Sequence, residues 1–113
     1  MPKMKSSLAW WCLEEVGLDP AGIIALAADA GYDGIELADP EFWPAIADAG
    51  LAIAAHRGHA SLEVGLNRRD QHDRIERELL ESIDLATRWG SPTLICFSGN
   101  RDGLSDEEGL HAT

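Results

Sequence analysis

Short apolar runs alternate with helical patterns along the whole chain. Four runs of five or six residues are candidates for strands, at 8–13, 34–38, 51–56 and 92–97. They are too short for stable helices and are rich in aromatic or branched residues, which is typical of strands. Between them, apolar residues recur every three or four positions, as on one face of a helix. The pattern therefore predicts a succession of strand–helix units.

Start and stop signals divide these helices from the strands. Asp-Pro pairs at 19–20 and 39–40 each place a carboxylate that can accept from free backbone N–H groups, followed by a proline that suits the first helical position. Gly31, Gly50 and Gly90 follow the expected helices, and glycine adopts the left-handed conformation that ends a helix at little cost.

The longest expected helix covers about residues 70–89. Its apolar positions share one helical face. These positions are Ile75, Leu79, Ile83 and Ala86.

The expected strands at 51–56 and 92–97 are apolar on both faces, as in a parallel sheet covered by helices. Parallel neighbours need crossover connections, and the chain supplies a helix between each pair of strands. The fold class is therefore α/β. Two architectures fit the pattern: a small open sheet with helices on both faces, or half of an eight-stranded barrel, whose full length is about 250 residues.

Composition narrows the class of protein. A formal net charge of -11 argues against nucleic acid as a partner. No apolar run approaches the ~18 residues of a membrane span, and residues 1–5 lack the features of a signal peptide. Cys12 and Cys96 each lie in an apolar stretch and are expected to be buried, reduced thiols. We therefore expect a cytoplasmic protein without a membrane partner.

Three stretches resemble a known superfamily. Residues 31–37, Gly-Tyr-Asp-Gly-Ile-Glu-Leu, resemble the second strand of the xylose-isomerase-like barrels of sugar isomerases and epimerases. Residues 94–101, Leu-Ile-Cys-Phe-Ser-Gly-Asn-Arg, and the helix start at 67–76 are similar to the hydroxypyruvate isomerase branch. The resemblance covers nearly all of the 113 residues. It implies that residues 1–113 are the N-terminal half, about four βα units, of a (β/α)8 TIM barrel, truncated at the start of the fourth helix near 105–110.

The same resemblance implies an activity for the parent protein. Its members are isomerases or epimerases that move a proton next to a carbonyl of a small sugar or of hydroxypyruvate, through an enediolate. They use a divalent metal, Mg²⁺ or Mn²⁺, with oxygen ligands. The metal ligands and the two glutamate bases belong to the later strands. We therefore expect no catalytic residue and no metal ligand in this chain, no metal bound to it alone, and no activity of this fragment by itself.

The candidate site residues follow the third and fourth strands, because active sites of such barrels lie at the carboxyl ends of the strands. They are expected to contact substrate hydroxyls or a substrate carboxylate. The candidates are His56, His59, Ser98, Asn100 and Arg101.

Each candidate has an alternative interpretation. Either histidine could instead be satisfied by a loop carbonyl, or the pair could bind a metal. Arg101 could pair with Asp102 or Asp106. Two other functions also remain open. One is a non-catalytic half-barrel that forms a homo-oligomer or binds a small ligand, and the other is an endonuclease-type zinc barrel.

Two further expectations concern side chains near the strands. Glu36 should point away from the helices and pair with a donor such as His56 or Arg57, because a lone buried carboxylate is costly. Trp10 and Trp11 point to opposite faces of the expected first strand, and both are expected in the core.

Overall fold

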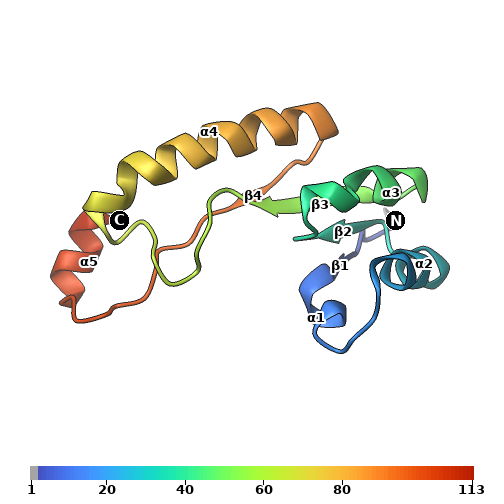
Figure 1. Cartoon of the computed structure of the whole chain (residues 1–113), viewed down its shortest axis with the longest axis horizontal. Coiled ribbons are helices and arrows are strands. Elements are labelled where there is room, and N and C mark those ends of the chain that lie inside the picture. Colours follow the sequence, from blue (N-terminus) through green and yellow to red (C-terminus); the bar gives the residue numbers. More distant parts are fainter. Residues whose placement is uncertain (1–2) are drawn as a thin grey trace. The chain divides into compact units, whose positions relative to one another are not determined.

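The computed structural model describes residues 3–113 and contains one four-stranded parallel sheet (Figure 1). The strands are β1 (Ser7–Ala9), β2 (Gly34–Glu36), β3 (Ala52–Arg57) and β4 (Leu94–Ile95), in the spatial order β1-β2-β3-β4. The backbone N–H groups of His56 and Gly58 donate to the carbonyls of Thr93 and Ile95, respectively. The α/β class and the parallel sheet predicted from the pattern are confirmed.

Helices connect every pair of neighbouring strands. The connecting helices are α1 (Trp10–Glu14), α2 (Pro20–Ala30), α3 (Trp43–Asp48) and α4 (His72–Trp89), with 3-10 turns η1 (Pro40–Phe42) and η2 (Arg69–Gln71). Helix α5 (Asp106–Ala112) follows β4. The chain divides into two compact units. The first holds the described residues up to His56 together with Trp89–Thr93, and the second holds Arg57–Arg88 and Leu94–Thr113.

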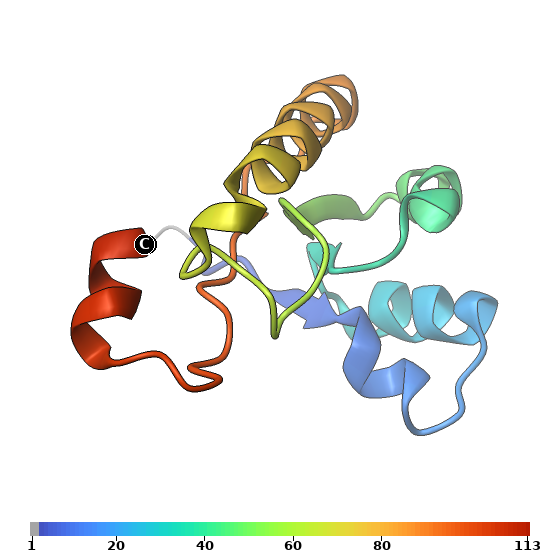
Figure 2. The same cartoon turned by 60° about the vertical axis from the view of Figure 1, so that its left-hand side comes forward.

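The first unit packs α2 and α3 against the strands. Figure 2 shows both helices on the same side of β1, β2 and the start of β3. Its core is mainly apolar, and Trp43 anchors it because the indole N–H donates to the carbonyl of Ala38 at 3.0 Å while the ring is fully buried. Other fully or nearly fully buried side chains of this core are Trp10, Ile23, Ala27, Ile35 and Ile46.

Local signals place α2 where the sequence predicts it. The Asp19 carboxylate accepts from the N–H of Gly22 at 2.7 Å, and Pro20 is the first helical residue. Gly31 ends the helix with φ of 84°, where a residue with a Cβ would be strained. These interactions join residues only a few positions apart, which is why the pattern alone predicted them.

The first expected strand is wrong over most of its length. Strand β1 ends at Ala9, and residues 10–14 form α1 instead. The helical turn separates the two indoles, so that Trp10 is 1% exposed and stacks on Phe42 while Trp11 is 49% exposed. Trp10 therefore belongs to the core as expected, and Trp11 does not. A five-residue apolar run contains too little periodicity to distinguish a single helical turn from a strand.

The second unit is built on α4. Ile75 and Ala86 are buried, as predicted, but Ile83 is half exposed, and Ser82 takes the inward position and donates to the carbonyl of Gly58 at 2.8 Å. Strand β4 is much shorter than the expected run at 92–97, and its two residues are only half buried.

The expectation for the cysteines is corrected in part. Cys12 and Cys96 are both free thiols, as predicted, but both are exposed. Cys12 lies in α1 rather than in a strand, and Cys96 follows the short β4 rather than lying inside a covered strand. The sequence could not show this because an apolar neighbourhood in the chain is not the same as a covered face in space.

Candidate functional site

His56 belongs to the first unit. It is the penultimate residue of β3 and is buried. The edge of its ring meets the indole of Trp43, with ring centroids 4.9 Å apart. This aromatic contact packs the imidazole into the core of that unit.

The other four candidates, His59, Ser98, Asn100 and Arg101, belong to the second unit. There the loop after β3 and the segment after β4 run together and exchange backbone hydrogen bonds. The N–H groups of Leu66 and Asn67 donate to the carbonyls of Phe97 and Ser98, at 3.0 and 2.8 Å, and the N–H of Asn100 donates to Glu63 at 2.7 Å. The carboxyl ends of two strands therefore lead into one joined pair of segments.

His59 connects these two segments through its ring. The backbone N–H of Phe97 donates to Nε2 at 2.9 Å, and Nδ1 lies 3.0 Å from the carbonyl oxygen of Ala60. Because a backbone N–H can only donate, Nε2 is the acceptor and Nδ1 carries the proton that Ala60 accepts. The ring is 2% exposed. Both nitrogens are engaged, which favours the interpretation of a histidine satisfied by the backbone.

Asn67 is a site residue that the sequence reasoning did not identify. Its Nδ2 donates to the carbonyl of Asn100 at 2.8 Å, and it is buried. Its Oδ1 lies beside Gly99 and has no hydrogen-bond partner among residues 3–113. The amide of an asparagine between two loops can bond to the backbones of both. The one sign of this role in the sequence was the presence of an asparagine just before a predicted helix start.

Arg68 also binds the backbone of the segment after β4. Its Nη2 donates to the carbonyls of Arg101 and Asp102, each at 3.0 Å, and lies 3.6 Å from the Asp102 carboxylate. Arg101 itself pairs with Asp106 at the start of α5. The pairing of Arg101 with Asp106 was one of the two alternatives that the sequence left open for this residue.

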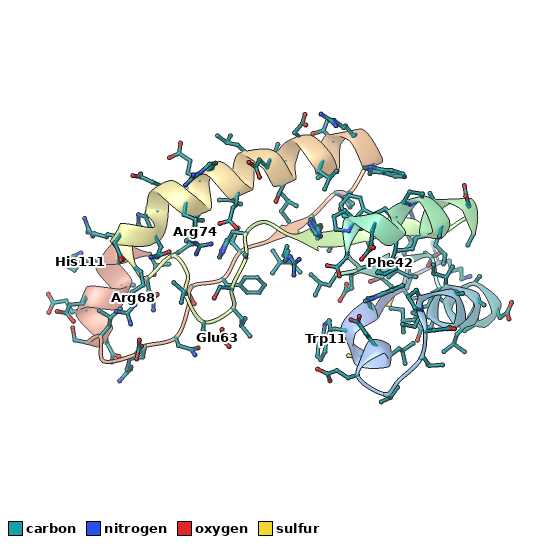
Figure 3. The ribbon with its side chains drawn as sticks, viewed as in Figure 1. Trp11, Phe42, Glu63, Arg68, Arg74 and His111 are labelled. Carbon is teal, nitrogen blue, oxygen red and sulfur yellow. The ribbon has the colours of Figure 1, made fainter. Side chains whose placement is uncertain are left out.

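Arg74 fastens the loop after β3 to α4. Figure 3 shows its side chain reaching from α4 toward the loop that carries Glu63. The guanidinium donates to the carbonyls of Ala60 and Val64 at 3.3 and 3.2 Å, and pairs with Glu78 at 2.5 Å. One side chain therefore satisfies two loop carbonyls and one carboxylate.

Two adjoining cavities in this unit lie against α5, between it and the residues 67–70 that precede α4 and the segment after β4. They have volumes of about 700 and 380 Å³ and share Asn67, Leu104 and Ser105 in their walls. Ser98 and Arg101 line the smaller one. Ser98 and Asn100 are exposed, so the polar groups after β4 are accessible to a small ligand.

Helix α5 bounds both cavities without burying any of its residues. Polar contacts hold it instead: Arg69 donates to the carbonyl of His111 at 3.1 Å, and Ser105 and Glu108 form a reciprocal capping box. The backbone N–H and then the side chain of Ser105 lower the pKa of the Glu108 carboxyl. This helix begins where the sequence predicts the fourth helix of the barrel to begin.

The donors of this site do not suit a divalent cation. Mg²⁺ and Mn²⁺ prefer carboxylate and carbonyl oxygens, whereas the walls combine guanidinium groups with carboxylates of which Asp106 is paired with Arg101 and Glu108 caps α5. Within residues 3–113, no three His, Cys, Asp or Glu side chains come together in a group that could hold a metal.

Glu36 has a partner in the first unit that was not expected. The Ser7 hydroxyl donates to Glu36 Oε2 at 3.0 Å. Ser7 and Glu36 come from the paired strands β1 and β2, so the hydrogen bond links the two strands through their side chains. The carboxylate is thus part of a polar contact, with a serine as the donor.

Comparison with known proteins identifies no family for this chain. No protein-family model, curated protein or solved structure matches the chain. In the part of the chain that the structure describes, no helix is long and apolar enough to cross a membrane.

Proposed function

We propose that the chain forms the first half of a barrel-type isomerase or epimerase. The parent enzyme would act on a small sugar or a hydroxypyruvate-like substrate by moving a proton next to a carbonyl. In this proposal the present chain supplies contacts to substrate oxygens, and the groups that move the proton come from the later strands, as the resemblance of residues 31–37 and 94–101 implies.

The strand order is the observation that carries the proposal. The four parallel strands follow one another as β1-β2-β3-β4 without a reversal. An open sheet with helices on both faces reverses its order at a switch point, whereas a barrel adds each strand beside the last. Right-handed crossovers then keep the helices on one side, and in the first unit α2 and α3 share a side (Figure 2). This order supports the barrel over the open sheet.

The segment after β4 is the part of this chain best suited to contact a substrate. Ser98 and Asn100 are exposed there, and Arg101 carries a guanidinium that can bind a carboxylate through two parallel hydrogen bonds. Its present partner, Asp106, is itself exposed. An exposed ion pair contributes only about 0–1 kcal/mol, so a substrate carboxylate could displace it at little cost.

A divalent metal is implied by the resemblance, but the residues of this chain do not fit it. Guanidinium groups line the cavities, both nitrogens of the His59 ring are engaged, and within residues 3–113 no three His, Cys, Asp or Glu side chains form a group that could hold a metal. We therefore assign no metal ligand here and derive no step through the metal. For the same reason we do not propose the zinc endonuclease.

Turnover tests the activity. The chain and the product of its complete reading frame should be assayed with hydroxypyruvate and common ketoses, with Mn²⁺ or Mg²⁺ present. We expect turnover only by the complete product. No turnover of any of these substrates by either protein would contradict the proposal.

Binding tests the role of this chain separately. In an NMR titration with hydroxypyruvate and a ketose, we expect the amide signals of Ser98, Asn100 and Arg101 to shift. Arg101→Gln should weaken binding of the carboxylate compound. Arg88→Gln is a matched control, because Arg88 also pairs with an aspartate and is 71% exposed, against 70% for Arg101. Equal effects of the two substitutions would argue against a role for Arg101.

A non-catalytic homodimer is the second candidate, favoured by the borders of the sheet. Among the described residues, β1 and β4 each pair with one neighbour only, because they lie at the two ends of the strand order. Unpaired strand borders invite pairing with another chain. Sedimentation equilibrium decides this point, since a tight dimer supports the candidate and a well-behaved monomer excludes it.

A further inference from the structure

The ring of His59 connects two segments, the loop after β3 and the segment after β4. This connection, made by His59, Ala60 and Phe97, is the joint between them. The ring receives the N–H of Phe97, which lies 38 positions away in the sequence, and donates to Ala60 beside it. The edge of the Phe97 ring also packs against the imidazole, with centroids 5.5 Å apart. The Phe97 carbonyl also accepts from the N–H of Leu66 at 3.0 Å, so His59 and Leu66 together connect the backbone of Phe97 to the loop after β3.

The neutral ring satisfies this joint and the protonated ring does not. In the neutral form, Nδ1 donates and Nε2 accepts, and each finds the required partner. A second proton on Nε2 would point at the N–H of Phe97, placing donor against donor at a separation of 2.9 Å. That hydrogen bond would be lost, and the buried ring would carry a charge without an acceptor for its new proton.

The charges around the ring offer no compensation. From α4, Arg74 donates to the same Ala60 carbonyl at 3.3 Å, and Glu78 accepts from the N–H of Ala60 at 3.3 Å. These two side chains pair with each other at 2.5 Å, so together they bring no net charge to the ring. From the segment after β4, the apolar Phe97 ring packs against the imidazole. The carboxylate of Glu78 already has the Arg74 guanidinium as its partner.

The joint lies next to the hydrogen bonds that hold the segment with the candidate site residues. The hydrogen bonds from Leu66 and Asn67 to Phe97 and Ser98 follow directly after it, and the bond from Asn100 to Glu63 comes next. A segment that loses the His59 hydrogen bond keeps these backbone bonds but loses the connection that begins the series. We propose that His59 helps to position the segment carrying Ser98 and Asn100, and that protonation of His59 removes its hydrogen bond to Phe97, so that this segment is held less tightly in acid.

Amide hydrogen exchange of the whole chain tests the proposal. We compare about pH 7.5 with about pH 5, a range in which histidine charge changes, and correct each rate for intrinsic exchange. Protection of the Phe97, Asn67 and Asn100 amides should fall about 2- to 10-fold more than protection of the α4 amides, as expected for the loss of one hydrogen bond. An equal change in both groups would overturn the proposal.

Substitutions assign the effect to this ring. His59→Gln keeps an acceptor for the Phe97 N–H but has no titrating group, so the excess loss of protection in acid should disappear. His111→Gln, at an exposed histidine, should leave it unchanged. Persistence of the excess loss in His59→Gln would contradict the proposal.

A direct measurement covers the case in which His59→Gln does not fold. Long-range ¹H–¹⁵N spectra of the unmodified chain report the tautomer of each histidine. At neutral pH, His59 should carry its proton on Nδ1. A proton on Nε2 would remove the basis of the proposal, whatever the variants do.

Discussion

The backbones of Gly65 and Gly99 touch: a Cβ on Gly65 would lie 2.7 Å from the backbone nitrogen of Gly99. The same added atom would also collide with the carbonyl oxygen of Phe97. Neither neighbour is a flexible side chain that could move aside. This contact brings the loop after β3 against the segment after β4, and it is possible only because neither glycine has a side chain.

Gly65→Ala should therefore destabilise the protein. We expect a loss of about 1–3 kcal/mol in the free energy of unfolding, the usual cost of forcing an extra carbon into a packed space. Urea denaturation measures it. Gly109→Ala is the control, because nothing lies within 4 Å of its added carbon in α5, and the free energy should stay equal or rise. A neutral Gly65→Ala would mean that the two segments are not in contact.

Removing Arg74 should cost more than removing a surface arginine. Arg74→Ala leaves the carbonyls of Ala60 and Val64 and the Glu78 carboxylate without this donor. Hydrogen bonds to a charged group contribute about 1.5–3 kcal/mol, so we expect a loss in that range.

The comparison variant is Arg88→Ala. Arg88 makes an exposed pair with Asp84 one turn away, worth at most about 0.5 kcal/mol. Thermal and urea unfolding of both variants check the difference. Losses of equal size would show that Arg74 does not fasten the loop.

The capping box of α5 should make this helix sensitive to acid. The Ser105 N–H holds the pKa of the Glu108 carboxyl below its ordinary value of 4.5. A carboxyl whose pKa is lowered by folding stabilises the folded form above its ordinary pKa, and this contribution disappears as the pH falls through the lowered pKa. Helix α5 should therefore lose amide protection in acid, below the pH at which free glutamate titrates.

A carboxyl-carbon NMR titration measures this pKa directly. Ser105→Ala keeps the backbone N–H and removes the hydroxyl, so the pKa of Glu108 should rise part of the way toward its ordinary value. Glu108→Gln should remove the acid-dependent loss of protection in α5. If the pKa of Glu108 is unchanged by Ser105→Ala, the side-chain half of the box is absent in solution.

Both thiols should react in the folded protein. Cys12 and Cys96 are exposed and unpaired with each other, so native protein treated with iodoacetamide should gain two adducts by mass spectrometry. Cys12→Ser and Cys96→Ser should each gain one. Modification that requires denaturant would restore the expectation of buried thiols.

Part of the candidate site could be predicted from the chain. The position rule for parallel strands selected His56, His59, Ser98, Asn100 and Arg101. The structure places the last four in the second unit, with Ser98 and Arg101 at one cavity, and places His56 in the first unit. It did not select Asn67, Arg68 or Arg74, because the backbone groups that they bind lie in other segments and leave no mark at their own positions. The burial of His59 and the exposure of Cys96 were likewise invisible, since both depend on what covers the side chain.

The sequence by itself determined the alternation of strands and helices and the ends of α2, because Asp19, Pro20 and Gly31 act on backbone groups within a few residues. It also placed the start of α5, where Ser105 and Glu108 cap each other. The tertiary structure decided that residues 10–14 form a helical turn, that Ile83 faces outward, and that the ring of His59 joins two segments. These outcomes depend on contacts between residues far apart in the chain, such as the 38 positions between His59 and Phe97, and short-range patterns carry no information about them.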